Sequence, residues 1–79
     1  MGNNIDGLHD RYYKNGQIKE SVLFKNGIEN GYYEMYFDNG QLKEVGYYKN
    51  GEKDGFFELY SEDGKLKAKG SYVNGEKIE

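Results

Sequence analysis

Few side chains in this chain could take part in catalysis. His9 is the only histidine and cysteine is absent. Without a second histidine or a cysteine, no nucleophilic relay can be assembled around the three serines, which are Ser21, Ser61 and Ser71. We therefore interpret His9 as a structural residue of a strand and predict that the protein is not an enzyme.

Phosphate and metal sites are equally poorly supported. The chain has 12 glycines, but they match neither the dinucleotide-binding pattern nor the P-loop pattern. Asp38-Asn39-Gly40 and Glu62-Asp63-Gly64 resemble fragments of calcium loops, yet the further oxygen ligands at alternating positions are missing. The sequence thus predicts no cofactor and no metal.

Carboxylates are the most regularly placed polar groups. Five of them could form a row across a sheet, namely Asp10, Glu20, Glu34, Glu44 and Glu58. Such a row could be a groove for a cation or for a basic segment of a partner. The alternative, which we favour, is that these groups are solvated or hydrogen-bonded to nearby tyrosine hydroxyls.

A 24-residue pattern organises almost the whole chain. Three copies align without a gap over residues 7–30, 31–54 and 55–78, preceded by an N-terminal lead-in of residues 1–6, within a repeat domain of residues 7–79. Positions that agree in all copies include the opening glycines Gly7, Gly31 and Gly55, the tyrosines Tyr12, Tyr36 and Tyr60, and the pairs Asn26-Gly27, Asn50-Gly51 and Asn74-Gly75.

Each copy is typical of two strands, because aromatic and β-branched residues cluster between glycine turns. In the central copy the strands are expected at about 32–37 and 41–48, with a second glycine turn in the longer connection 49–54. Hairpin turns are expected at Asn15-Gly16, Asn39-Gly40 and Asp63-Gly64. The predicted fold class is all-β, a single-layer, six-stranded antiparallel meander of three stacked hairpins.

Side-chain alternation predicts which residues share a face. A three-residue hairpin loop puts Tyr36 opposite Leu42, and the core face then holds Leu8, Tyr12, Ile18, Phe24, Tyr32, Tyr36, Leu42, Tyr48, Phe56, Tyr60, Leu66 and Tyr72. In this register Gly46 lies opposite Tyr32. Glu34 opposes Glu44 and Asp10 opposes Glu20, both unfavourable pairs of like charges. A two-residue loop avoids these pairs but separates Tyr36 from Leu42, so we prefer the three-residue loop.

The opposite face supplies the candidate partner-binding surface: Tyr33, Met35, Phe37, Val45, Tyr47, Phe57 and Leu59. Tyrosine rings that lie flat on the sheet with wetted hydroxyls are the alternative interpretation. A single layer cannot cover its own apolar stripe, and its outer strands leave backbone groups unpaired. We therefore expect a protein partner, with a homodimer as the first candidate.

Length and charge restrict the other partners. A chain of 79 residues forms at most one small domain, and its net charge of -3 argues against nucleic acid and disfavours anionic phospholipid. Residues 1–6 lack the basic and apolar regions of a signal peptide. We expect a cytoplasmic protein, or a secreted or surface protein if the chain is a fragment.

The motif G-x-x-x-x-Y-x-x-x-G-x-L-K, followed by G-x-Y-x-N-G-x-x-x-G, carries a family likeness. It resembles the MORN repeat in its bacterial variant form, although Val22-Leu23 replaces the Gly-Tyr of Gly46-Tyr47 in the first copy. The resemblance implies hairpins stacked into one elongated sheet and a non-catalytic scaffold for self-association or protein binding. It also implies two further possibilities, an antitoxin-like role and binding of membrane phospholipid. The residues themselves suggest another alternative, a ligand-binding module in which the tyrosine-rich face stacks glycans.

Overall fold

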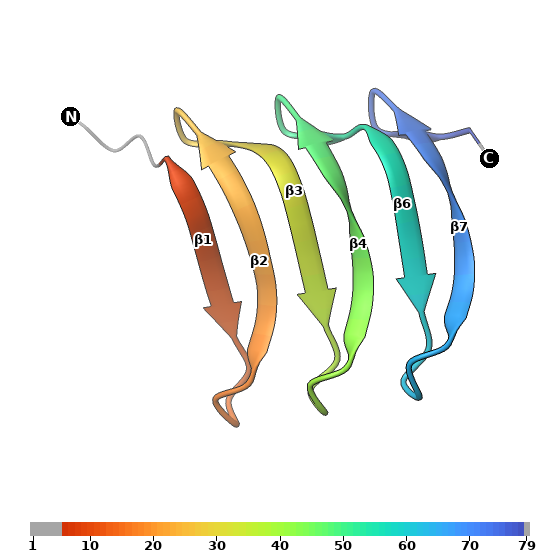
Figure 1. The fold of residues 1–79 in the computed structure, drawn as a ribbon. Helices are drawn as coiled ribbons and strands as arrows, with labels where there is room; N and C mark the ends of the chain where they lie inside the picture. Colours follow the sequence, from red (N-terminus) through yellow and green to blue (C-terminus); the bar gives the residue numbers. More distant parts are fainter. Residues whose placement is uncertain (1–5, 79) are drawn as a thin grey trace.

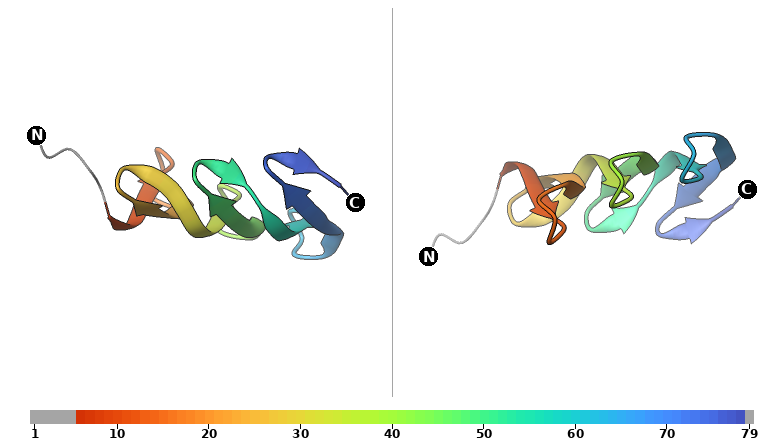
Figure 2. Two further views of the ribbon diagram at one scale, coloured as in Figure 1. Left: turned by 90° about the horizontal axis from the view of Figure 1, so that it is seen from above. Right: turned by 90° about the horizontal axis from the view of Figure 1, so that it is seen from below.

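The computed structural model describes residues 6–78, which fold into one antiparallel β-sheet (Figure 1). The lead-in predicted at residues 1–6 lies, except for Asp6, outside the described residues. The three hairpins follow one another in a single row when the sheet is viewed along its strands (Figure 2). The Cα atoms span 43 × 35 × 13 Å, so the protein is a thin slab with two open faces.

The sheet has meander order, as predicted. Its strands are β1 (Gly7–Tyr12), β2 (Ile18–Lys25), β3 (Ile28–Tyr36), β4 (Leu42–Lys49), β5 (Glu52–Lys53), β6 (Gly55–Tyr60), β7 (Leu66–Val73) and β8 (Glu76–Lys77). The main strands lie in the order β1-β2-β3-β4-β6-β7, while β5 pairs with β4 and β8 pairs with β7. The all-β class is confirmed, and the two very short strands account for the difference from six.

The hairpin turns at one edge have the predicted three-residue loop. Phe37 N donates to Gln41 O at 2.8 Å, and Gly40 N donates to Phe37 O at 3.0 Å. Gly40 has a φ of 91°, whereas the Asn39 side chain stabilises the loop by accepting a hydrogen bond from Gln41 N at 2.9 Å. The loop length inferred from Tyr36 and Leu42 is therefore confirmed.

The opposite edge is tighter than the sequence suggested. Asn50 and Gly51 both have positive φ, 52° and 86°, and they join Lys49 to Glu52 as a two-residue hairpin. Such mirror-image turns suit the twist of paired strands. Part of the predicted connection 49–54 is therefore paired strand.

A β-bulge in each hairpin changes the predicted register. Tyr36 does pair with Leu42, but Met35 pairs with Glu44, so Lys43 is an extra residue on β4. The same shift occurs beside Tyr12 in the first repeat and beside Tyr60 in the third. Beyond the bulge every cross-strand pair moves by one residue.

This shift removes the predicted opposition of like charges. Glu34 faces Val45 and not Glu44. In the first repeat Asp10 faces Ser21, whose Oγ donates to Asp10 Oδ1 at 2.8 Å. The predicted pairing of Glu34 with Glu44 and of Asp10 with Glu20 was therefore wrong, and the bulge is the reason.

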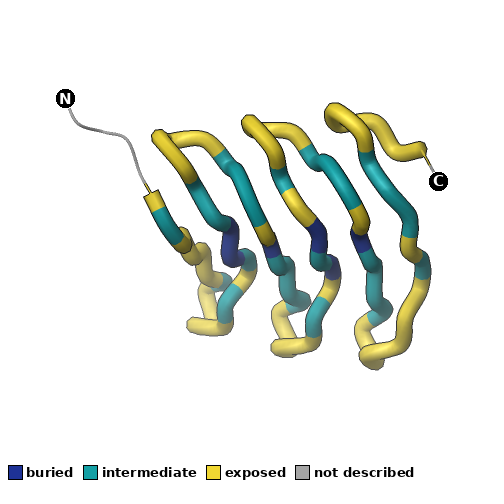
Figure 3. Tube along the Cα trace, turned by 45° about the horizontal axis from the view of Figure 1, so that its top comes forward, coloured by how far each residue is buried: buried dark blue, intermediate teal, exposed yellow. Residues whose placement is uncertain are grey.

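The bulge also reassigns the core. We call the side that carries Tyr33, Glu44, Tyr48, Phe57 and Tyr72 face A, and the side that carries Tyr32, Glu34, Tyr47 and Phe56 face B. Face A holds the buried apolar residues, which are Val22, Tyr33 and Phe57 at 3%, 0% and 1% exposure. Buried positions follow one another across the middle of the strands in Figure 3.

The predicted core stripe was therefore only partly right. Its members Leu8, Tyr12, Tyr32, Phe56 and Leu66 are exposed. Gly46 pairs with Tyr33 and not with Tyr32. The ring of Tyr33 lies over this glycine, which lets a single layer bury an aromatic side chain.

Hydrogen bonds at both edges link neighbouring repeats and also link the first repeat to the lead-in residue Asp6. At the Asn-Gly edge, Asn26 N donates to Asp6 Oδ1 at 2.7 Å, and Asn50 N donates to Asn30 Oδ1 at 3.1 Å. Asn74 N makes the corresponding bond to Asp54. These bonds recur at the repeat period of the sequence.

Hydrogen bonds at the hairpin-loop edge also link neighbouring repeats. Asn15 Nδ2 donates to Asp38 O at 3.1 Å, and Asn39 Nδ2 donates to Glu62 O at 3.3 Å. The equivalent residue of the third repeat is Asp63, which has no amide to donate. Likewise, the residue equivalent to Asp6, Asn30 and Asp54 is Ile78, which has no side-chain acceptor.

Candidate functional site

The predicted partner-binding residues do not form one surface. The register places Tyr33, Met35, Phe57 and Leu59 on face A, Val45 and Tyr47 on face B, and Phe37 at the start of a hairpin loop. Tyr33 and Phe57 are part of the core, so they present no free surface in this chain. Tyr47 remains 48% exposed.

The most developed polar cluster on face A surrounds the ammonium of Lys53. Its Nζ lies 2.9 Å from Glu44 Oε2 and 5.4 Å from the ring centroids of both Tyr33 and Tyr72. The hydroxyl of Tyr33 donates to the same Glu44 oxygen at 2.5 Å. We call Tyr33, Glu44, Lys53 and Tyr72 the lysine cage.

The electrostatics of the lysine cage favour one protonation state. Burial and the hydrogen bond to Glu44 raise the pKa of Tyr33. Burial lowers the pKa of Lys53, but the hydrogen bond and charge of Glu44 outweigh it, and the net shift is upward. Tyr33 therefore stays neutral and Lys53 stays cationic at neutral pH, which makes the cage a cross-link between the second and third repeats.

The first repeat has no lysine at the corresponding place. Instead, face A carries a hollow of about 210 Å³ lined by His9, Arg11, Glu20, Val22, Phe24 and Glu29, which we call the first-repeat hollow. His9 and Phe24 meet edge to face with ring centroids 5.5 Å apart. Sequence reasoning missed both clusters, although the signal was visible: Glu29, Lys53 and Lys77 occupy one position of the repeat.

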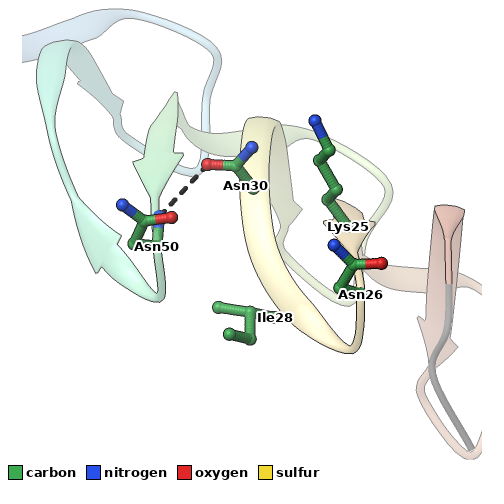
Figure 4. Close-up of a pocket in the computed structure, with 5 residues that line it drawn as sticks. All are labelled: Lys25, Asn26, Ile28, Asn30 and Asn50. Carbon is green, nitrogen blue, oxygen red and sulfur yellow. Dashed lines mark hydrogen bonds between the residues drawn. The ribbon is translucent and has the colours of Figure 1, made fainter.

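A second hollow, of about 220 Å³, lies at the Asn-Gly edge of the sheet. It is lined by Lys25, Asn26, Ile28, Asn30 and Asn50. Figure 4 shows the hydrogen bond from Asn50 to Asn30 across this hollow. The Asn30 side chain and the Asn50 backbone amide are thus already used to hold the two turns together. The residues that line this hollow do not form a catalytic group.

Face B combines exposed rings with tethered tyrosine hydroxyls. The rings of Tyr32 and Tyr47 meet edge to face, 5.6 Å apart. Glu34 accepts hydrogen bonds from the hydroxyls of Tyr36 and Tyr32 at 2.7 and 3.3 Å, and the bond to Glu34 is the main reason that the pKa of Tyr36 rises to about 12. Hydrogen bonding of carboxylates to tyrosine hydroxyls, the alternative that we favoured, is therefore observed for Glu34, Glu44 and Glu58.

Within residues 6–78, no group of three or more histidine, cysteine, aspartate or glutamate side chains could hold a metal ion. No helix in the same part of the chain is long and apolar enough to cross a membrane.

The comparisons with known proteins concern the repeat itself. A family model described as MORN repeat variant matches residues 5–26, 29–50 and 53–74. The matched segments begin 24 residues apart, two residues earlier than copies drawn from the opening glycines. No match was found among curated proteins or among solved structures. Since the three matched segments cover most of its length, the chain belongs to the MORN repeat variant family.

Proposed function

We propose that the protein is a non-catalytic scaffold that self-associates, with face B packing against face B of a second copy. MORN repeats are generally associated with binding of proteins or membrane lipids. The observation that carries the proposal is the exposure of large apolar side chains on face B: Leu8, Tyr12, Tyr32, Tyr47, Phe56, Leu66 and Val73.

The energetics of face B favour an apolar cover. Tyr47, Phe56 and Leu66 are each close to half exposed, at 48%, 49% and 51%. Fully burying an exposed side chain of this size contributes about 1.5 to 3 kcal/mol, so a half-exposed one contributes roughly half of that. Summed over both copies, the exposed side chains of face B can offset an association cost of roughly 4 to 15 kcal/mol. A second copy of the chain presents the same apolar surface. A contact related by a two-fold axis covers face B of both copies and leaves neither free to bind a third copy in the same way.

Sedimentation velocity over a concentration series tests this proposal. We expect a homodimer of micromolar or tighter affinity, and we expect Phe56→Ser to weaken it by about tenfold, corresponding to roughly 1.4 kcal/mol. Ile78→Ser is the matched control, because Ile78 is 56% exposed but follows the last strand. A monomer at every concentration would overturn the proposal. Binding of a different protein in place of a second copy would point to a hetero-partner, of which an antitoxin-like role is one form.

A ligand-binding module is the second candidate function. The exposed, edge-to-face rings of Tyr32 and Tyr47 favour it, because such rings can stack on sugars or enter a lipid interface. A glycan array and a liposome pulldown test this function with Tyr47→Ala. We expect loss of binding in the variant if face B is the site. The net charge of -3 predicts weak binding to anionic phospholipid.

A further inference from the structure

The lysine cage has a partial counterpart in the third repeat, where Ala68 replaces Glu44. In the third repeat, Lys77 occupies the position of Lys53 and its Nζ lies 5.8 Å from the ring centroid of Phe57. The second and third repeats therefore each place a lysine ammonium over a buried ring on face A.

The first repeat keeps part of the surroundings of the cage but changes its charge. Glu20 occupies the position of Glu44 and Glu29 that of Lys53, while His9 and Tyr48 occupy the positions of the rings of Tyr33 and Tyr72. Glu29 pairs with Phe24 across β2 and β3, so its carboxylate lies on face A beside the ring. Two carboxylates thus line the hollow where the second repeat has one carboxylate and one ammonium.

The local cations do not balance these carboxylates. Among residues 6–78, the only ion pair made by either is that of Arg11 with Glu20, at 3.7 Å, and the Arg11 side chain is 69% exposed. His9 contacts Phe24 through its ring. Burial raises the pKa of Tyr48, whose ring belongs to the next repeat; the charge of Lys53 lowers it, and the charges of Glu29 and Glu20 raise it. With two carboxylates and one guanidinium in its lining, the hollow carries a net negative formal charge.

We propose that the first-repeat hollow binds a lysine side chain of a partner protein, whose ammonium lies between Glu20 and Glu29 beside the ring of Phe24. The hollow has a volume of about 210 Å³, which is enough for an alkylammonium. Lys53 is the precedent one repeat further along: its ammonium meets one carboxylate and two rings, at positions that correspond to Glu20, His9 and Tyr48.

The expected affinity for an isolated ammonium is low. A cation over an aromatic ring contributes about 0.5 to 2 kcal/mol, and a half-exposed ion pair contributes up to about 1 kcal/mol. A small probe should therefore bind in the millimolar range, and in a protein complex the same contact acts as a specificity anchor. The hollow lies on face A, opposite the proposed self-association surface, so the two proposals can be tested separately.

Titration with n-butylammonium chloride, followed by two-dimensional NMR of the full chain at constant ionic strength, tests the site. We expect saturable shifts at Val22, Phe24 and Glu29, with sodium chloride alone producing none. Glu29→Lys should abolish the response, because the new ammonium occupies the place that Lys53 holds in the second repeat. Glu62→Lys makes the same charge change in an exposed hairpin loop and should leave the response intact.

A second variant tests the site even if the Glu29→Lys protein does not fold. Glu29→Gln removes the charge without adding an ammonium and should weaken probe binding by about threefold to fivefold, corresponding to roughly 0.7 to 1 kcal/mol. Unsaturable shifts, equal shifts with sodium, or unchanged binding in Glu29→Gln would each overturn the proposal. A response to tetramethylammonium as strong as that to n-butylammonium would also overturn it, because a quaternary ion cannot donate a hydrogen bond to a carboxylate.

Discussion

A Cβ atom added to Gly46 would lie 2.8 Å from the hydroxyl oxygen of Tyr33 and 2.9 Å from its Cε2 atom. The glycine is therefore required for space, since the ring of Tyr33 lies on the backbone of the neighbouring strand. In the first repeat the same pair of positions is occupied by Val22 and His9, a larger residue opposite a smaller ring. The two residues of this pair thus compensate each other in volume.

Gly46→Ala should destabilise the fold by about 1 to 3 kcal/mol, the usual cost of overpacking a well-filled site. Urea denaturation followed by far-UV circular dichroism measures this cost. Gly46→Val combined with Tyr33→His reproduces the first-repeat pair and should cost less than the sum of the two single changes, by about 1 kcal/mol or more. Additive costs would show that the two positions are not coupled.

The stability of the protein should fall as the pH rises above 10. Tyrosines of the unfolded chain ionise near pH 10.0, whereas the pKa of Tyr36 rises to about 12 in the folded chain and that of Tyr33 rises further. A raised pKa in the folded state means that the stabilisation is complete below pH 10 and is lost above it. Urea denaturation at a series of alkaline pH values should show a shallower loss for Tyr33→Phe than for the parent chain.

Lys53→Met should destabilise the protein by about 1.5 to 3 kcal/mol, because it leaves the shielded Glu44 without its charged partner. Thermal unfolding of the single and double variants checks this. Adding Glu44→Gln to Lys53→Met should recover part of the loss, since the unpaired charge is then gone. Glu34→Gln is the matched control on face B and should have a smaller effect, because Glu34 is more exposed than Glu44. An equal loss for Glu34→Gln would contradict the special role of the lysine cage.

Asn50→Ala should cost about 1 to 2 kcal/mol, because alanine is strained at the φ of 52° found there. Asn50→Gly should cost less, since glycine adopts that conformation without strain. Chemical denaturation of both variants tests the prediction. Asn39→Ala is the comparison at the other edge, where only Gly40 has positive φ, and its loss should reflect side-chain hydrogen bonds instead of backbone strain.

Much of the fold could be predicted because its signals are local. The Asn-Gly and Asp-Gly pairs marked the turns, and Tyr36 with Leu42 indicated the three-residue loop. The bulge at Lys43 could not be recognised, because an extra residue in a ladder has no side-chain signature of its own. Since Tyr32 and Tyr33 are both tyrosine, side-chain type could not show which of them faces the core. The clue was the opposition of Glu34 and Glu44, which a one-residue shift removes.

The candidate site was less predictable for a related reason. Lys53 lies just after a turn, in a stretch expected to be a connection, so its contact with Glu44 was not foreseen. Comparison of Glu29, Lys53 and Lys77 at one repeat position could have drawn attention to it. Burial in a single layer depends on which ring covers which glycine, and that depends on the bulge.

The substitutions at Asp63 and Ile78 have a consequence for how separate molecules meet. A second molecule that added its first hairpin to the β7 side would extend the ribbon, and repetition of that contact would build a fibre. At that junction Asp63 has no side-chain amide to donate and Ile78 has no side-chain oxygen to accept. The outer edge therefore offers neither of the bonds that Asn39 and Asp54 make to the following hairpin inside the chain. The chemistry of this outer edge thus works against open-ended polymer growth and in favour of assemblies of finite size.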